Sequence, residues 1–175
     1  MLTRIPSNLI PWIVLAASAA TLSAAYFFQY VLGYQPCSLC LQERIPYILA
    51  IGAALIAGIL SREANLGIWP VVFMGLCALA FAAGAILSAY HVGVEYKWWA
   101  GPSSCSGTTL VMPQSLEDMH KAIANPVHLP RCDAAAWTLF GVSLAGFNFL
   151  ISVALFVLAA LSPVRFWLEA HGEDL

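Results

Sequence analysis

The chain has 175 residues, of which 61% are hydrophobic and only 9% are charged, and its formal net charge is −2. A water-soluble domain of this length needs more charge on its surface, so we interpret the chain as an integral membrane protein. The sequence has no basic stripe that could bind phosphates, which excludes a nucleic-acid partner.

Charged residues are absent from four long stretches of the chain: 5–42, 45–61, 64–94 and 134–164. A membrane-spanning helix needs about 20 apolar residues. We therefore predict one all-α membrane domain over residues 1–175, a four-helix transmembrane bundle. Its helices are expected at about 9–32, 41–60, 68–90 and 137–161, with loops on one side of the membrane at about 33–40 and 91–136.

The first predicted helix follows Arg4, and its apolar run continues to about Leu32. This run is too long for the apolar core of a signal peptide, which has roughly 7–15 residues. We expect an uncleaved first helix.

The first loop leads into a Cys-x-x-Cys motif, Cys37 to Cys40, which is followed by Glu43 and Arg44. Arg44 lies four residues after Cys40, on the same helical face. Helix N-termini and neighbouring cations favour the reactive thiolate of a cysteine, so we expect a redox pair tuned by Arg44. A metal site or a structural disulfide is the alternative for the two cysteines, and an interfacial anchor is the alternative for Arg44.

The second and third helices are joined by a short polar segment, 61–67, and should form an antiparallel hairpin. Cys77 falls inside the third helix and is expected to be a small core residue. Within the long loop, residues 113–124 read as a short amphipathic helix that begins near Ser115 and ends at Asn125-Pro126. Its apolar stripe would lie either on the bilayer surface or against the rim of the bundle.

The other two cysteines, Cys105 and Cys132, lie in the long loop, on the same side of the membrane as Cys37 and Cys40. Cysteines that face water in pairs indicate an oxidising compartment. The count of basic residues on the two sides does not decide the orientation, so the cysteines do: we predict periplasmic loops and cytoplasmic termini. Cys105, in a Gly- and Ser-rich segment, is the outermost. A zinc site and a plain loop disulfide remain as alternatives.

The chain resembles the disulfide bond formation protein B (DsbB) family of the bacterial inner membrane. The segments that carry the resemblance are CSLCLQERIPY, from Cys37, and RCDAAAWTLFGVSLAGFN, from Arg131. It implies a thiol:quinone oxidoreductase that oxidises a soluble DsbA-like, thioredoxin-fold partner and reduces ubiquinone or menaquinone, with no metal. It further implies that the partner attacks Cys105–Cys132 and that Cys37–Cys40 reduces the quinone. Arg44 matches the family's quinone-site arginine, and His91 is a weaker match near the quinone.

Two other classes of protein are alternatives to this interpretation. An enzyme similar to vitamin K epoxide reductase shares the four-helix quinone chemistry, but would carry its Cys-x-x-Cys on the last helix pair. A non-catalytic membrane protein with structural disulfides, or a metal carrier, would need neither Arg44 nor a quinone.

Overall fold

The computed structural model describes residues 6–62, 67–102, 115–116 and 131–171. Cys105 and the predicted loop helix at 113–124 lie outside these described residues, apart from positions 115–116. The elements are η2 (Ser7–Leu9), α1 (Ile10–Tyr30), α2 (Ser38–Gln42), α3 (Arg44–Leu60), α4 (Trp69–Glu95), β1 (Thr138–Leu139), β2 (Val142–Ser143) and α6 (Leu144–His171).

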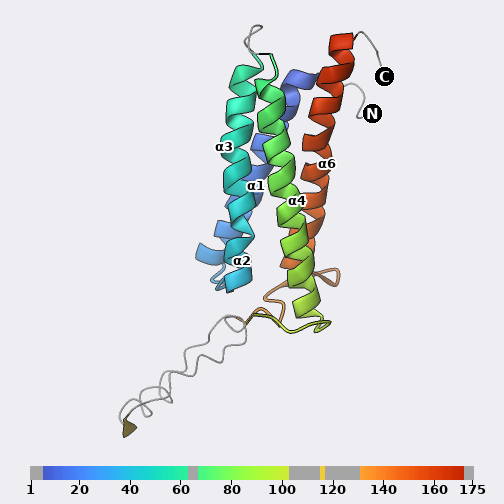
Figure 1. Ribbon diagram of the computed structural model, residues 1–175. Coiled ribbons are helices and arrows are strands. Elements are labelled where there is room, and N and C mark those ends of the chain that lie inside the picture. The colour runs from blue at the N-terminus through green and yellow to red at the C-terminus, as the bar shows by residue number, and fades with distance from the viewer. Residues whose placement is uncertain (1–5, 63–66, 103–114, 117–130, 172–175) are drawn as a thin grey trace.

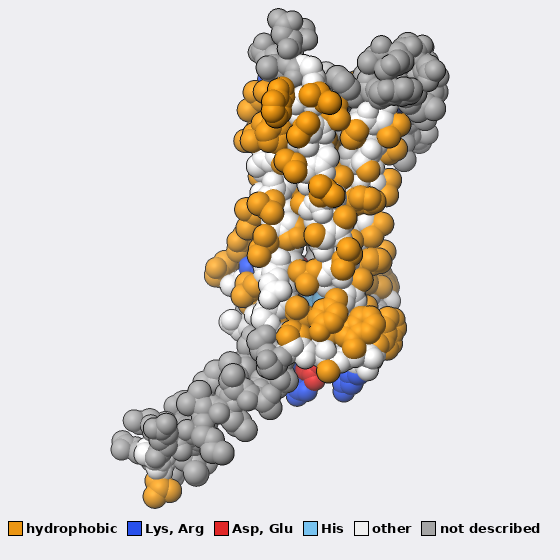
Figure 2. All heavy atoms as spheres, viewed as in Figure 1, with side chains coloured by type: hydrophobic (Ala, Val, Ile, Leu, Met, Phe, Trp, Pro, Cys, Tyr) orange, Lys and Arg blue, Asp and Glu red, His pale blue; other side chains and the backbone are white. Residues whose placement is uncertain are grey.

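Four helical segments are long and apolar enough to cross a membrane: α1, the combined α2 and α3, α4 and α6. They run side by side as a bundle, with both chain termini at one end and α2 at the other (Figure 1). Apolar side chains cover the bundle along its length, as contact with lipid requires (Figure 2). The predicted fold class, a four-helix transmembrane bundle, is confirmed.

Small residues let the helices pack closely around one core. Helix α3 packs between α1 and α4, and α4 makes its most extensive contact with α6. Ala50, Ala54 and Ala57 of α3 are fully buried in this core. A side chain at Gly84 of α4 would come within 3.3 Å of Pro46 on α3, so a residue without a side chain is favoured at that crossing.

The second membrane span is interrupted between Gln42 and Arg44, where α2 ends and α3 begins. Pro46 explains the break, because a proline has no N–H to donate and its ring clashes with the carbonyl four residues earlier, that of Gln42. The break isolates a single helical turn that carries the Cys-x-x-Cys motif at the end of the bundle.

The last helix begins at Leu144 and not at about residue 137 as predicted from the sequence. Residues 138–143 instead form a two-stranded hairpin, in which Thr138 pairs with Ser143 and Leu139 with Val142. Both turn residues, Phe140 and Gly141, have positive φ angles of 52° and 80°, as a two-residue hairpin turn requires. Ser143 then caps α6, because its Oγ accepts a hydrogen bond from the N–H of Gly146.

Helix α4 extends to Glu95, beyond the predicted end at about residue 90. His91 therefore belongs to the last turns of α4 and not to a loop. Its side chain points into the bundle, where it is buried. The extra helical turn brings His91 to the depth of α2, beside the cysteines.

Candidate functional site

The Cys-x-x-Cys motif is organised by the short helix α2. Cys37 is the N-cap of this helix, and its Sγ accepts a hydrogen bond from the backbone N–H of Cys40 at 3.3 Å. An N-cap side chain satisfies a backbone N–H that has no partner within the helix. The sulfur atoms of the two cysteines lie 2.8 Å apart, and both thiols are free.

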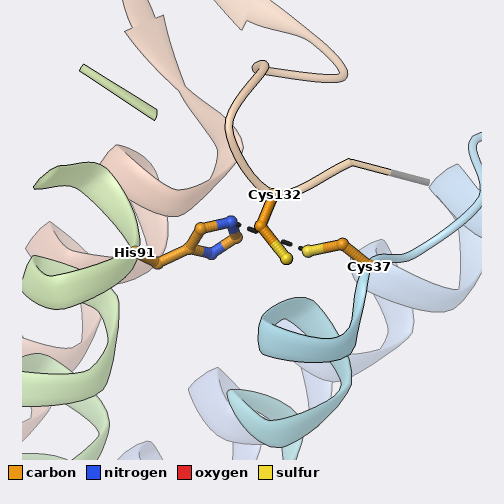
Figure 3. Close-up of side chains that lie close together, drawn as sticks. All are labelled: Cys37, His91 and Cys132. Atoms are coloured by element: carbon orange, nitrogen blue, oxygen red, sulfur yellow. Dashed lines mark hydrogen bonds between the residues drawn. The ribbon is translucent and has the colours of Figure 1, made fainter. Parts of the chain in front are cut away.

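Cys37 meets a histidine and a third cysteine on the inner side of α2 (Figure 3). The Nε2 atom of His91 lies 3.6 Å from the Sγ of Cys37. The Sγ of Cys132, the Sγ of Cys37 and a ring nitrogen of His91 all lie within 4.8 Å of one another. These side chains are almost fully enclosed, with exposed fractions of 3% for Cys37, 2% for His91 and 0% for Cys132.

Cys132 is disulfide-bonded, in contrast to the free Cys37 and Cys40. The three side chains have donor atoms close enough together to surround a metal ion. A sulfur in a disulfide is not a thiolate, however, and the thiolate is the form of cysteine that binds metals. The arrangement described here is therefore suited to thiol–disulfide exchange.

The hydrogen bonds around Cys37 stabilise its thiolate. The bond with the Cys40 thiol lowers the pKa of Cys37 most strongly, burial opposes this, and the hydrogen bond and positive charge of His91 lower the pKa further. The net result is a pKa well below that of an ordinary cysteine. In the reduced pair, Cys37 is thus the better placed nucleophile.

A buried carboxylate supports the histidine from its other side. Oε1 of Glu43 lies 2.7 Å from Nδ1 of His91, and Oε2 of Glu43 accepts a hydrogen bond from Nδ2 of Asn148 at 2.8 Å. Glu43 is itself only 6% exposed. Both of its oxygens therefore have a partner, as a carboxylate inside a membrane bundle requires.

The polar network continues from Asn148 deeper into the bundle. Nδ2 of Asn148 also donates to Oγ of Ser88 at 2.7 Å, and Oδ1 of Asn148 accepts a bond from the Tyr47 hydroxyl at 2.6 Å. The Tyr47 hydroxyl lies 3.0 Å from Oγ of Ser152. The network thus joins α3, α4 and α6 next to the cysteine site, on its membrane-inward side.

A cavity of about 340 Å³ lies between α1, the α2–α3 span and α6, and Cys40 is part of its wall. Its lining is mostly apolar, including Leu22, Phe28 and Trp137, and its polar lining residues include Cys40, Glu43, Arg44 and Asn148. Cys37 is not among the lining residues. The two cysteines therefore have different neighbours. Cys40 lines the lipophilic cavity, whereas Cys37 lies beside Cys132.

Arg44 lies at the wall of the same cavity and is held by two side chains of α1. Its Nη1 donates to Oε1 of Gln29 at 2.7 Å, and its guanidinium lies 4.9 Å from the ring centre of Tyr26. Within the described residues no carboxylate forms an ion pair with Arg44. The positive charge is thus fixed by an amide and an aromatic face, and it is not neutralised locally.

The structure brings together most of the residues that the sequence singled out. Cys37, Cys40, Cys132 and His91 form one cluster, and Arg44 shares the cavity wall with Cys40. Cys105 lies outside the described residues, and Cys77 is a buried core residue of α4 as expected.

Sequence reasoning assigned no role to Glu43, Tyr47 or Asn148. A signal for two of them was present: Glu43 is one of few acids in an apolar chain, and Asn148 interrupts the apolar run of the last helix. Intramembrane polar residues of this kind mark functional sites by default. Tyr47 carried no such signal, because tyrosine is also common at membrane interfaces.

The fold and the site define a class of protein: a helical membrane protein with a dithiol and a disulfide at one end of the bundle, beside a lipophilic cavity. The family model of disulfide bond formation protein DsbB matches residues 7–162. The chain belongs to this family and is a multi-pass inner-membrane oxidoreductase of disulfide bond formation.

Individual relatives agree with the family match. The disulfide bond formation protein B of Verminephrobacter eiseniae is 32% identical over 151 residues, which cover 84% of this chain and 80% of that protein. The protein of the same name in Methylococcus capsulatus is 29% identical over 151 residues, with 85% and 87% covered. An uncharacterised protein of Rickettsia prowazekii is 29% identical over 150 residues, with 85% and 83% covered. No solved structure gives a significant match.

The geometry predicts that the reduced protein holds a thiolate at Cys37 at pH values where an ordinary cysteine, with a pKa of about 8.5, is protonated. The measurement is a pH titration of the thiolate ultraviolet absorbance in reduced protein without added quinone. The low-pH step should disappear in Cys37→Ser and persist in Cys77→Ser. A step that survives in Cys37→Ser would contradict this assignment.

Proposed function

We propose that the protein reoxidises a soluble periplasmic dithiol carrier of the thioredoxin fold, DsbA-like, and passes the electrons to a membrane quinone, ubiquinone or menaquinone. The observation that carries this proposal is the division of the cysteine pair between two spaces. Cys40 lines the lipophilic cavity, while Cys37, whose sulfur is 2.8 Å away, lies beside Cys132. Electrons can thus arrive on one side of the pair and leave on the other.

The residues that line the cavity fit a quinone head group. The cavity holds about 340 Å³ and is walled mainly by apolar side chains of α1, the α2–α3 span and α6. Arg44 and Asn148 would hold the polar edge of the head group, since both carry N–H donors. A bound quinone supplies the acceptor for two electrons and two protons.

Thiol–disulfide exchange moves the electrons from the partner to the cysteine pair. Cys105 is the remaining cysteine of the five, and we assign it as the disulfide partner of Cys132. A thiolate of the carrier attacks Cys105 and releases Cys132, which then attacks Cys37 of the oxidised pair and frees Cys40 as a thiolate. The carrier's second thiol releases the oxidised carrier and Cys105, and Cys105 attacks Cys132 and frees Cys37.

This sequence of exchanges ends in the redox state that the structure describes. Cys37 and Cys40 are then free thiols and Cys132 is again in a disulfide. Re-forming the Cys37–Cys40 disulfide releases two electrons and two protons toward the cavity. The low pKa of Cys37 favours this step, because a thiolate is the species that attacks.

The proposed orientation follows from the same chemistry. Disulfide exchange with a soluble carrier requires the oxidising periplasm, so the end of the bundle that carries α2 faces that compartment. Both termini lie at the other end, which we assign to the cytoplasm (Figure 1).

The exchange path predicts a trapped intermediate. In Cys132→Ser, Cys105 is a free thiol, and its thiolate can attack the disulfide of the oxidised carrier. Because no Cys132 is present to displace the carrier from Cys105, a mixed disulfide between Cys105 and the carrier should accumulate. The measurement is non-reducing electrophoresis with peptide mapping after addition of an oxidised DsbA-like protein. Cys77→Ser should trap nothing. A trapped species linked through Cys37 or Cys40 would reverse the proposed roles of the two pairs.

Arg44 gives a test of quinone binding. Arg44→Gln and Arg44→Lys should both raise the KM for quinone in assays of quinol formation, with Lys the milder because it keeps the charge but loses the planar guanidinium. The loss in kcat/KM for Arg44→Gln should reach about 10-fold or more, since a hydrogen bond to a charged group contributes about 1.5–3 kcal/mol. Single-turnover reaction of the carrier with Cys105–Cys132 should be unchanged in both.

The matched control for this measurement is Arg62→Gln. Arg62 also packs on an aromatic ring, 5.0 Å from the ring centre of Trp12, but it follows the opposite end of α3. Its substitution should leave the quinone kinetics unchanged. Unchanged quinone kinetics in Arg44→Gln would contradict a role in quinone binding and would leave Arg44 as an anchor at the membrane interface.

A further inference from the structure

Glu43 is the residue that touches both halves of the site. Its Oε1 lies 2.7 Å from His91, whose other ring nitrogen reaches Cys37, and the same residue lines the lipophilic cavity beside Cys40. We propose that Glu43 carries the proton of Cys37, through His91, to the molecule bound in the cavity. This inference rests on the proposed function and names the proton route for that reaction.

A proton route is required because oxidation of the cysteine pair releases protons inside the bundle. Oxidation of a dithiol releases two protons together with two electrons, and the thiols of this pair are enclosed by the bundle. Cys37 is only 3% exposed, so its proton needs a protein group that accepts it. The Nε2 atom of His91, 3.6 Å away, is that acceptor among the described residues around Cys37, because the other near neighbours are sulfur atoms.

The first transfer runs along two hydrogen bonds and passes through a charged histidine. The Cys37 thiol gives its proton to Nε2 of His91, which leaves a Cys37 thiolate and a positively charged imidazole beside the Glu43 carboxylate. The proton on Nδ1 of His91 then passes to Oε1 of Glu43. The products are a Cys37 thiolate, an imidazole that is neutral again with its proton on Nε2, and a neutral carboxyl group. The total charge of the three groups stays at −1, so no additional charge is created inside the bundle.

The second transfer delivers the proton to the cavity. Glu43 is the one carboxyl group among the described residues that line it, and the nearby Arg44 keeps its proton because a guanidinium does not deprotonate in proteins. Loss of the proton returns Glu43 to the carboxylate. The route carries one proton per reaction, that of Cys37. The Cys40 thiol lines the cavity itself, so its proton and the electron pair leave there directly.

Asn148 acts as a positioning residue for this carboxyl group. Its Oδ1 accepts the hydrogen bond from the Tyr47 hydroxyl, so its Nδ2 is the atom that faces Glu43. The amide N–H thus binds Oε2 of Glu43 and leaves Oε1 for the exchange with His91. The competing interpretation is that Glu43 only joins α3 to α4 and α6 through these bonds.

Two substitutions at Glu43 separate proton transfer from a structural role. Glu43→Gln keeps the length and the hydrogen-bonding capacity of the side chain but not the acid, whereas Glu43→Asp keeps the acid and shortens the side chain. Proton transfer by Glu43 predicts a fall in kcat for quinol formation of about 100-fold or more in the Gln variant, with Asp faster than Gln. A purely structural role predicts the reverse order.

Glu95→Gln is the matched control. Glu95 is a second partly buried carboxylate one turn beyond His91 on α4, but it accepts its hydrogen bond from Ser143 and does not line the cavity. Its substitution should leave quinol formation within about twofold of wild type, the range of a substitution outside the reacting groups.

A second readout needs no quinone. Glu43→Gln removes the anion that supports a charged His91, so the thiolate titration of Cys37 in the reduced protein should move upward by about one pH unit. Cys40 and Glu95 are the other titratable groups near Cys37 and His91, and they remain in place. The Glu95→Gln titration should move less.

The outcomes distinguish this inference from the function on which it rests. A wild-type protein that forms no quinol would overturn the proposed function itself. Wild-type turnover together with normal kcat in Glu43→Gln, or a Gln variant faster than the Asp variant, would overturn the proton route alone. An unchanged Cys37 titration in Glu43→Gln would overturn the link through His91.

Discussion

A carboxylate inside a membrane bundle requires partners on both oxygens, and the rest of this site depends on how Glu43 obtains them. One partner comes from α4 and the other from α6, through His91 and Asn148. Removing one partner from a buried charge costs about 3–5 kcal/mol. The ends of three helices are therefore held at one depth, the depth at which Cys37 and Cys40 lie.

Local backbone rules place the cysteines at that depth. Pro46 interrupts the second span, and the turn that precedes the interruption is a separate short helix with Cys37 as its N-cap. The N-cap position turns one sulfur inward to His91 and Cys132, while the N3 position turns the other sulfur to the cavity. A single helical turn thus separates the thiol that exchanges disulfides from the thiol that faces the membrane ligand.

The bundle itself could be predicted from the sequence, because four charge-free stretches leave no other fold for a chain this apolar. The redox pair and Arg44 could also be predicted, since they are adjacent in sequence. The start of the last helix could not: Trp137 to Ser143 is as apolar as a helix, and the hairpin turn depends on Phe140 adopting a positive φ angle that this residue type rarely adopts.

Long-range partners were the other part of the site that the sequence did not reveal. Glu43 and Asn148 are 105 residues apart, and their hydrogen bond depends on the rotation of two helices about their own axes. Because polar and charged residues are rare in this chain, the sequence identifies Glu43 and Asn148 as unusual. It does not predict that the two side chains contact each other.

We propose that Cys40, and not Cys37, faces the bound quinone, and this contact can be measured directly. In Cys105→Ser, Cys132 is free to form a disulfide with Cys37, which leaves Cys40 as a thiolate at the cavity. Addition of quinone to this purified variant should give a visible absorption band from the thiolate–quinone contact. The band should be absent from the Cys105→Ser/Cys40→Ser double variant, in which the same Cys37–Cys132 disulfide is formed beforehand with a thiol oxidant such as diamide. A band that persists in the double variant, or no band in Cys105→Ser, would contradict the account.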